Sequence, residues 1–84
     1  MHSAAAVARG SGRIRKWLPD APRGAFAFIE LVGGENLFTP ARSFVGTWPH
    51  GIGEGLNVRV LEIGEAPKTN MLRVALRVEL DSWN

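Results

Sequence analysis

The 84-residue chain contains no cysteine and no tyrosine, and it has only two histidines, His2 and His50. The absence of cysteine excludes a disulfide scaffold and a thiolate metal site. Two histidines cannot build a histidine metal cage, and no convincing Ser-His-Asp arrangement can be assembled from them. The acidic residues are scattered rather than paired. We therefore predict that the protein is not an enzyme and has no catalytic residue, no metal site and no cofactor.

Long hydrophobic runs are missing as well. The longest run without a charged residue, Ser43–Gly53, has 11 residues, whereas a membrane-spanning helix needs about 20 apolar residues. The N-terminus lacks the cationic start and apolar centre of a secretory signal. We expect no membrane partner and a cytoplasmic location.

The composition is that of a small globular domain rich in turns. Hydrophobic residues make up 45% of the chain, and there are ten glycines and five prolines. A chain of this length holds one domain with a small core. Residues 1–11 are small and show no apolar period, so we predict a disordered tail there and a domain over residues 12–84.

Positive charge is concentrated at the front of the chain. Residues 1–23 carry five basic groups and one acid, a net charge of +4, whereas residues 24–84 carry five basic and seven acidic groups, a net charge of −2. Excess positive charge on one segment suggests a polyanionic partner, because phosphate attraction dominates nucleic-acid affinity. Solvated basic segments are common, so the asymmetry is only a hint.

Five segments have the composition and the alternation of β-strands, and turn residues separate them. No segment shows a helical period, so the pattern predicts an all-β fold, either a small closed barrel or a sandwich. The predicted strands are Arg13–Leu18, Ala25–Val32, Asn36–Thr39, Leu56–Ile63 and Met71–Leu80.

The first and last of these strands carry specific expectations. In the first, Ile14 and Leu18 share the inner face, and Lys16 falls on that face unless a bulge intervenes. In the last, Leu and Val occupy every second position, so we expect them to fill the core together. The length of this strand also suggests an exposed edge that pairs with another chain. The alternating residues are Leu72, Val74, Leu76, Val78 and Leu80.

Phe26 and Phe28 are the most informative residues of the second strand. They lie on one face, while Ala27, Ile29 and Leu31 lie on the other. If the second face builds the core, both rings are displayed, and displayed aromatic pairs usually bind something. Bases of single-stranded nucleic acid are natural partners because every base offers a π face. If the rings themselves fill the core, this mechanism fails, and the pattern alone leaves both interpretations open.

Four short blocks of residues 12–63 match, in order, the motifs of one known family. Residues 12–19 are similar to Gly-x-Val-Lys-Trp-Phe-Asn, and residues 24–29 match Lys-Gly-Phe-Gly-Phe-Ile at both Phe and at Ile. Phe38 stands at the Phe of Val-Phe-Val-His, and residues 54–58 are similar to Glu-Gly-Gln-x-Val. Over these residues the chain resembles the cold-shock domain family. The resemblance implies a five-stranded antiparallel OB-type barrel that binds single-stranded RNA or DNA with low sequence specificity, like a nucleic-acid chaperone.

Carried over to this sequence, the resemblance implies an aromatic platform with basic residues around it. The implied stacking residues are Trp17, Phe26, Phe28, Phe38 and Trp48. The implied polar and phosphate-contacting residues are Arg13, Arg15, Lys16, Arg23, Arg42 and His50. Two alternatives without a binding role stay open, since Trp48 can instead plug the end of the barrel and His50 can be an ordinary loop residue.

Departures from the family pattern leave a second hypothesis open. Ala25 and Ala27 replace the two glycines of the first motif, Pro40 replaces the histidine of the second, and Ala41 replaces the aromatic after it. One extra residue precedes Trp17, which would reorient its ring. These changes favour weaker or altered binding. The alternative is a protein-interaction or self-associating OB module, and we expect a monomer or a weak homodimer.

Overall fold

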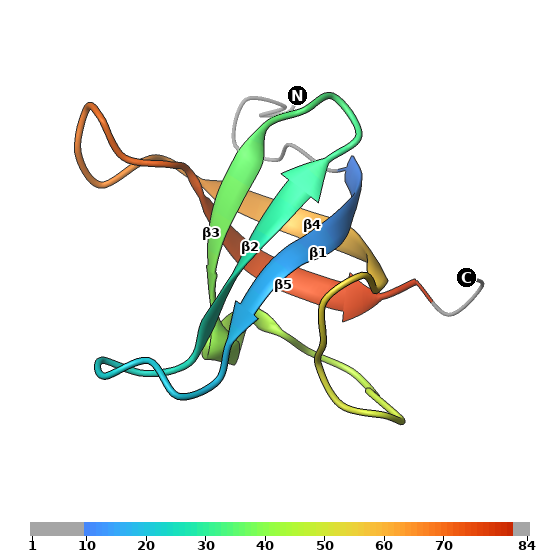
Figure 1. Ribbon diagram of the computed structural model, residues 1–84. Coiled ribbons are helices and arrows are strands. Elements are labelled where there is room, and N and C mark those ends of the chain that lie inside the picture. The colour runs from blue at the N-terminus through green and yellow to red at the C-terminus, as the bar shows by residue number, and fades with distance from the viewer. Residues whose placement is uncertain (1–9, 82–84) are drawn as a thin grey trace.

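The computed structural model describes residues 10–81, which form five strands and one short helix (Figure 1). A 3-10 helix, η2 (Ala41–Ser43), follows the third strand. The strands are β1 (Gly10–Leu18), β2 (Phe26–Leu31), β3 (Asn36–Pro40), β4 (Asn57–Gly64) and β5 (Val74–Leu80).

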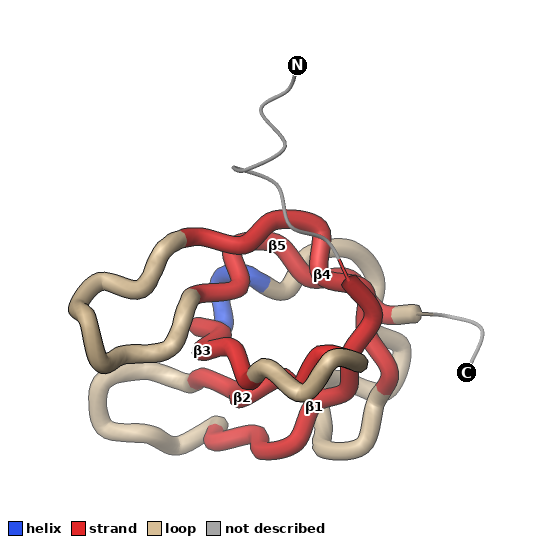
Figure 2. The backbone as a smooth tube through the Cα atoms, turned by 90° about the horizontal axis from the view of Figure 1, so that it is seen from above, coloured by secondary structure: helices blue, strands red, loops and turns tan. Residues whose placement is uncertain are grey.

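The strands close into a barrel in the order β1-β2-β3-β5-β4, and β4 pairs with β1 to complete the ring. All neighbours are antiparallel except β3 and β5, which are parallel. Figure 2 shows the ring of strands from above. The predicted all-β, five-stranded OB-type barrel is thereby confirmed.

Inward-facing residues of all five strands fill the barrel. Alternation along β2 turns Ala27 and Ile29 inward, where both are fully buried, while Phe26 and Phe28 stay partly exposed. Of the two interpretations that the pattern left open, the structure therefore shows the one in which both rings are displayed. The buried apolar residues are Ile14, Ala27, Ile29, Leu37, Val58, Val60, Ile63, Ala75 and Val78.

A bulge in β1 overturns one expectation about its faces. Ile14 pairs with Ile29, but the next paired residue is Lys16, opposite Phe28, so Arg15 is an extra residue. The bulge turns Lys16 outward and places Leu18 opposite Phe26, on the outer side. Leu18 therefore does not share the inner face with Ile14, as the simple alternation predicted, and it is only partly buried.

A bend between β4 and β5 overturns the expected alternation of the last strand. The pairing is irregular between Val60 and Ile63, and it leaves Leu61 and Leu76 without a partner across the ladder. Such irregularities sharpen the local bend that a barrel needs. As a result Ala75 and Val78, three residues apart, are buried, while Leu76 is 43% exposed.

The expected exposed edge of β5 is also wrong. β5 pairs with β4 on one side and meets β3 through Phe38 and Val74 on the other. Beyond β3, Phe44 bridges to Val78, and the Val45 amide donates to the Val78 carbonyl at 2.9 Å. The edge is covered within the chain, and whether the protein self-associates stays a prediction.

The start of the domain lies earlier than expected. Gly10 and Ser11 belong to β1 and pair with Val60 and Arg59, so the predicted tail over residues 1–11 is too long by these two residues. The rest of that tail lies outside the described residues. At Gly12 the strand approaches β2 so closely that a Cβ would stand 2.7 Å from the Glu30 carbonyl oxygen.

Among residues 10–81, no helix has the length and apolar character needed to cross a membrane.

Candidate functional site

Three phenylalanine rings form a cluster on the outer surface of β2 and β3. Register places Phe28 opposite Phe38, and alternation places Phe26 on the same side. The ring centroid of Phe26 lies 5.5 Å from that of Phe28 and 5.2 Å from that of Phe38, and Phe28 and Phe38 are 6.4 Å apart. All three rings remain partly exposed. These contacts hold the rings as one continuous aromatic surface.

Three adjoining hollows surround this cluster, and we call them together the aromatic trough. The central hollow, of about 510 Å³, lies between Phe28, Phe38 and the connection from β4 to β5. A second, of about 440 Å³, joins it at Phe38 and runs toward Arg23. A third, of about 550 Å³, joins it at Phe28 and Leu72 and runs toward Lys16. The central hollow therefore shares lining residues with each of the other two, and together the three hollows are lined by all three rings.

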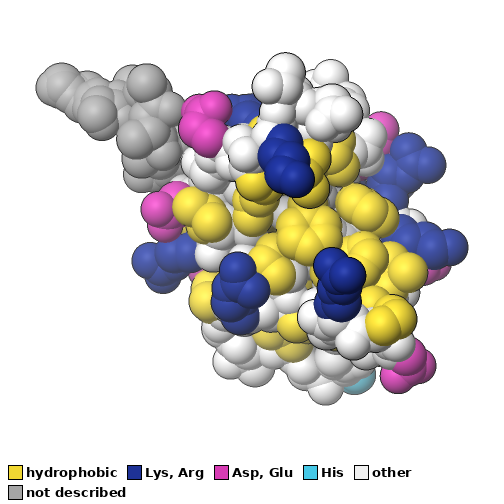
Figure 3. All heavy atoms as spheres, turned by 90° about the vertical axis from the view of Figure 1, so that its left-hand side faces the viewer, with side chains coloured by type: hydrophobic (Ala, Val, Ile, Leu, Met, Phe, Trp, Pro, Cys, Tyr) yellow, Lys and Arg dark blue, Asp and Glu magenta, His cyan; other side chains and the backbone are white. Residues whose placement is uncertain are grey.

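The charge around the aromatic trough is of one sign. Its four charged lining residues are Arg15, Lys16, Arg23 and Arg42. Within the described part of the chain, no Asp or Glu lines any of the three hollows. Figure 3 shows this side of the molecule as a broad hydrophobic surface with Lys and Arg side chains standing over it. A surface of this kind suits a partner that has both flat apolar groups and negative charge.

The cations of the trough differ in whether they form an ion pair with an acidic side chain. Arg15 lies 3.6 Å from the Glu30 carboxylate, a loose pair between an exposed and a partly exposed side chain. Lys16, Arg23 and Arg42 form no ion pair with any acid among residues 10–81. Their charge is therefore available to a ligand.

Trp17 and Trp48 do not join the phenylalanine cluster. Because of the β1 bulge, Trp17 pairs with the buried Ala27 and packs against the core, edge-on to Phe44 at 5.9 Å. Trp48 stands edge-on to Phe44 at 5.2 Å and donates its indole N–H to the Val45 carbonyl at 2.8 Å. We call Trp17, Phe44 and Trp48 the cap cluster. Its geometry is that of a plug on the core, the alternative that the sequence had left open for Trp48.

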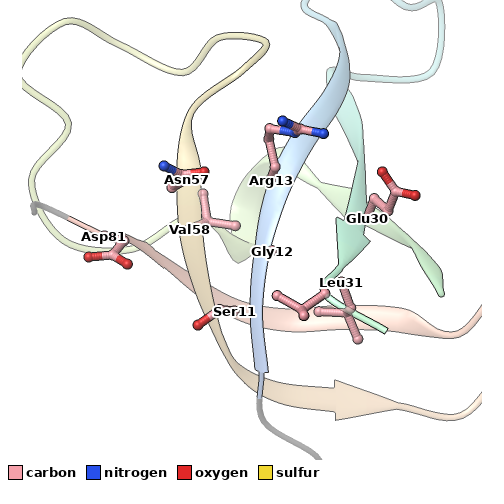
Figure 4. A pocket seen from close by; sticks show the side chains of 9 residues that line it. Ser11, Gly12, Arg13, Glu30, Leu31, Asn57, Val58 and Asp81 are labelled. Carbon is pink, nitrogen blue, oxygen red and sulfur yellow. The ribbon is translucent and has the colours of Figure 1, made fainter. Parts of the chain in front are cut away.

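Arg13 and His50 also lie away from the trough. Arg13 lines a separate hollow of about 300 Å³ that is bordered by Glu30, Asn57 and Asp81 (Figure 4). Two acids beside one arginine make this hollow unlike the trough in charge. His50 is exposed in the connection between β3 and β4 and lines none of the four hollows.

The four residues that depart from the two family motifs obstruct the trough less than the sequence suggested. Ala27 is fully buried, so its methyl group points into the core and does not face the rings. Ala25 lines the hollow next to Phe26, where its methyl group adds apolar surface. Pro40 lines two of the three hollows and Ala41 lines one, so both take part in the wall.

Residues of the connection from β4 to β5 form part of the trough, and sequence reasoning missed them. Pro67, Asn70, Met71 and Leu72 line the same central hollow as Phe28 and Phe38. The sequence does contain a sign of an exposed apolar surface here, because Met71 and Leu72 are consecutive large apolar residues beside turn residues. The expected alternation placed Leu72 in the core, so its exposure was not predicted.

An ion pair fixes this connection against the turn between β2 and β3. The Arg73 guanidinium donates through Nε and Nη2 to the two carboxylate oxygens of Glu35 at 2.7 and 2.6 Å. These hydrogen bonds lower the pKa of Glu35 and raise that of Arg73. The Arg73 carbonyl also accepts the Phe38 N–H at 3.0 Å, so main chain and side chain both anchor the connection.

In the described region, no group of three or more His, Cys, Asp or Glu side chains is placed to hold a metal ion. Comparison of the chain with protein-family models, with curated proteins and with solved structures gives no match.

Proposed function

We propose that this protein binds single-stranded nucleic acid, RNA or DNA, along the aromatic trough. The observation that carries the proposal is that three displayed rings and four cations, with no acid, line three adjoining hollows. Unpaired bases stack on rings, and phosphates are attracted to cations, so one strand satisfies both features at once. A base-paired duplex hides the faces of its bases from such a surface.

The chemistry of the trough favours low sequence specificity. Stacking is tolerant of sequence because each base has a π face, and the gain is about 1–3 kcal/mol per base. Reading a base requires hydrogen-bonding groups at its edge. Asn36 and Asn70 are the neutral amide side chains among the lining residues, against seven apolar or aromatic residues around the central hollow alone.

The resemblance to the cold-shock family supports the same proposal from the sequence side. The matched residues Phe26, Phe28 and Phe38 are those whose rings meet on the surface. A chaperone-like use, in which the protein holds strands unpaired, follows as part of the proposal. Trp17, Trp48, Arg13 and His50, which the resemblance also implied, are not needed for it.

Titration of a fluorescently labelled oligo-pyrimidine strand tests the proposal. A label on the strand is preferable to intrinsic fluorescence, because Trp17 and Trp48 pack in the cap cluster. We expect Phe28→Ala to weaken binding by about 5- to 150-fold, which corresponds to the loss of one stacked base. The variant should stay folded, since the Phe28 ring is partly exposed.

Val32→Ala is the control, because Val32 is 85% exposed and lies outside the trough. We expect it to bind as the wild type does. If the wild type does not bind the strand, or if Phe28→Ala and wild type bind equally well, the proposal is wrong.

A further inference from the structure

The outer surface of β4 and β5 is a second exposed surface, separate from the aromatic trough. The two strands pair with each other and lie across the ring from β2 (Figure 2). We call their outward-facing residues the β4–β5 face. They line none of the four hollows, so the face suits a flat partner rather than a small molecule in a pocket. These residues are Arg59, Leu61, Glu62, Leu76, Arg77 and Glu79.

Two leucines supply the apolar part of the β4–β5 face. Leu76 is 43% exposed and lies over Gly64, where an added Cβ would stand 3.0 Å from the leucine side chain. Leu61 follows the fully buried Val60, so alternation directs it outward, and it is partly exposed. Exposed apolar side chains gathered on one surface mark a place where a partner binds.

The charged residues of the β4–β5 face alternate in sign in both directions. Register places Arg59 opposite Glu79 and Glu62 opposite Arg77, so each strand carries one charge of each sign. Arg59 lies 3.5 Å from the Glu79 carboxylate. Within residues 10–81, neither Glu62 nor Arg77 forms an ion pair. The face therefore has no net charge, and it has one acid and one base available to a partner.

This charge pattern is complementary to itself. In a dimer with two-fold symmetry, the same patch of both copies forms the interface. If the two-fold axis runs along the strands, β4 of one copy faces β5 of the other. Each Glu62 then meets the Arg77 of the other copy, and each Arg59 meets the other Glu79. The cations of the aromatic trough would instead repel their own copies, since like charges across an interface are unfavourable.

We infer that the protein forms a homodimer in which the β4–β5 faces of two copies pack together. No residue of the face lines the trough, so the inference does not depend on the proposed function. The sheets stack face to face, and no strand edge is needed. A stable interface uses about 20–30 residues from each partner. The face is smaller, so we expect a weak dimer with a Kd between about 10 μM and 1 mM.

Sedimentation equilibrium of the full chain, from about 1 μM to about 1 mM, tests the inference. We expect Leu76→Ser to weaken the dimer about 30-fold. Each of the two copies loses about 40 Å² of apolar contact, at about 25 cal/mol per Å². Leu72→Ser is the matched control, because Leu72 is 41% exposed but lies in the trough. It should self-associate as the wild type does.

A charge exchange tests which residues face each other. Glu62→Lys and Arg77→Glu each place like charges across the interface, so each variant alone should dimerise about tenfold more weakly. An equimolar mixture of the two variants should dimerise within about twofold of the wild type, because both contacts between copies then join opposite charges. A folding defect of the single variants would not be repaired by mixing them.

Three outcomes would overturn the inference. In the first, the wild type stays monomeric up to about 1 mM, which would leave the β4–β5 face to a partner of another kind. In the second, Leu76→Ser and Leu72→Ser weaken the dimer equally. In the third, the mixture of charge variants is no tighter than either variant alone. The strand titrations with Phe28→Ala decide the proposed function separately, so each idea can fail without the other.

Discussion

Each phenylalanine of the trough faces outward because smaller neighbours along the strand fill the barrel. Ala27, Ile29 and Leu37 are fully buried, so the interior is complete without the rings. The rings then contact one another at 5.2 to 6.4 Å instead of the core. Substitution of a ring and substitution of an inward neighbour should therefore have separable effects, the first on binding and the second on stability.

The side-chain hydroxyl of Thr39 lowers the free energy of unfolding. It is fully buried on β3, and its hydroxyl has no hydrogen-bond partner among the described residues. Burying such a group without a partner costs about 1–3 kcal/mol. We expect Thr39→Val, which has nearly the same shape, to raise the free energy of unfolding by about 1 kcal/mol in urea titrations.

Thr47→Val is the matched control, because Thr47 is exposed. It should leave the unfolding midpoint unchanged. A lower midpoint for Thr39→Val would mean that the hydroxyl has a partner in solution.

At the scale of elements, two connections between strands have different roles. The connection from β3 to β4 supplies Phe44, Trp48, Ile52 and Leu56, which pack against the core. The connection from β4 to β5 instead leaves Met71 and Leu72 exposed beside the trough. Two loops with similar apolar content thus have different roles, because only the first returns over the open end of the core.

Trp48→Ala should separate these roles. Removing a large side chain that packs on the core costs about 2–4 kcal/mol, so the variant should unfold at a lower urea concentration. Its affinity for a labelled single strand should remain within about twofold of wild type at a temperature where it is folded. Trp48→Phe keeps most of the packing and should recover most of the stability.

The reverse pattern would change the assignment of Trp48. A fivefold or larger loss of affinity in both folded variants would place Trp48 in the binding surface. Phe28→Ala, measured beside them, is expected to lose affinity and keep its stability.

At the scale of the whole molecule, the fold decides where the charged side chains lie, and the net charge of +2 does not show this distribution. Arg15, Lys16 and Arg23 come from the basic front segment, but Arg42 comes from the segment after β3. Acids engage cations elsewhere, as Glu79 does with Arg59 at 3.5 Å. The result is one positive, apolar face on a molecule that is nearly neutral as a whole (Figure 3).

Salt dependence of binding measures this arrangement. Each phosphate neutralised on a single strand contributes about −0.7 to the slope of log affinity against log salt, so four contacts give about −3. We expect Arg42→Gln to reduce the magnitude of the slope by about 0.7. Arg59→Gln removes the same charge away from the trough and should leave the slope unchanged. Equal slopes for the two variants would mean that net charge, not the trough, attracts the strand.

The alternation of the sequence alone determined the all-β class, because a period of two is a local property of each strand. It left a closed barrel and a sandwich open, and the resemblance implied the barrel. The alternation also identified Phe26 and Phe28 as sharing a face, although it could not say which face was outside. Phe38 and the cations Arg15, Lys16, Arg23 and Arg42 were implied by motif order, and the fold brings them together around the rings.

Only the tertiary structure decided the rest, because bulges and loop paths depend on what lies across the sheet. The extra residue Arg15 sends Trp17 to the cap cluster, and the irregular pairing of β4 with β5 exposes Leu76 and breaks the expected core stripe. Leu72 lines the same hollow as Phe38, and Arg73 is hydrogen-bonded to Glu35. In each case the partner lies about 35 residues away in the sequence. A local sequence pattern cannot show contacts over such a separation. The sequence therefore predicted the phenylalanine platform, and the fold added Met71 and Leu72 to the lining of the same hollow.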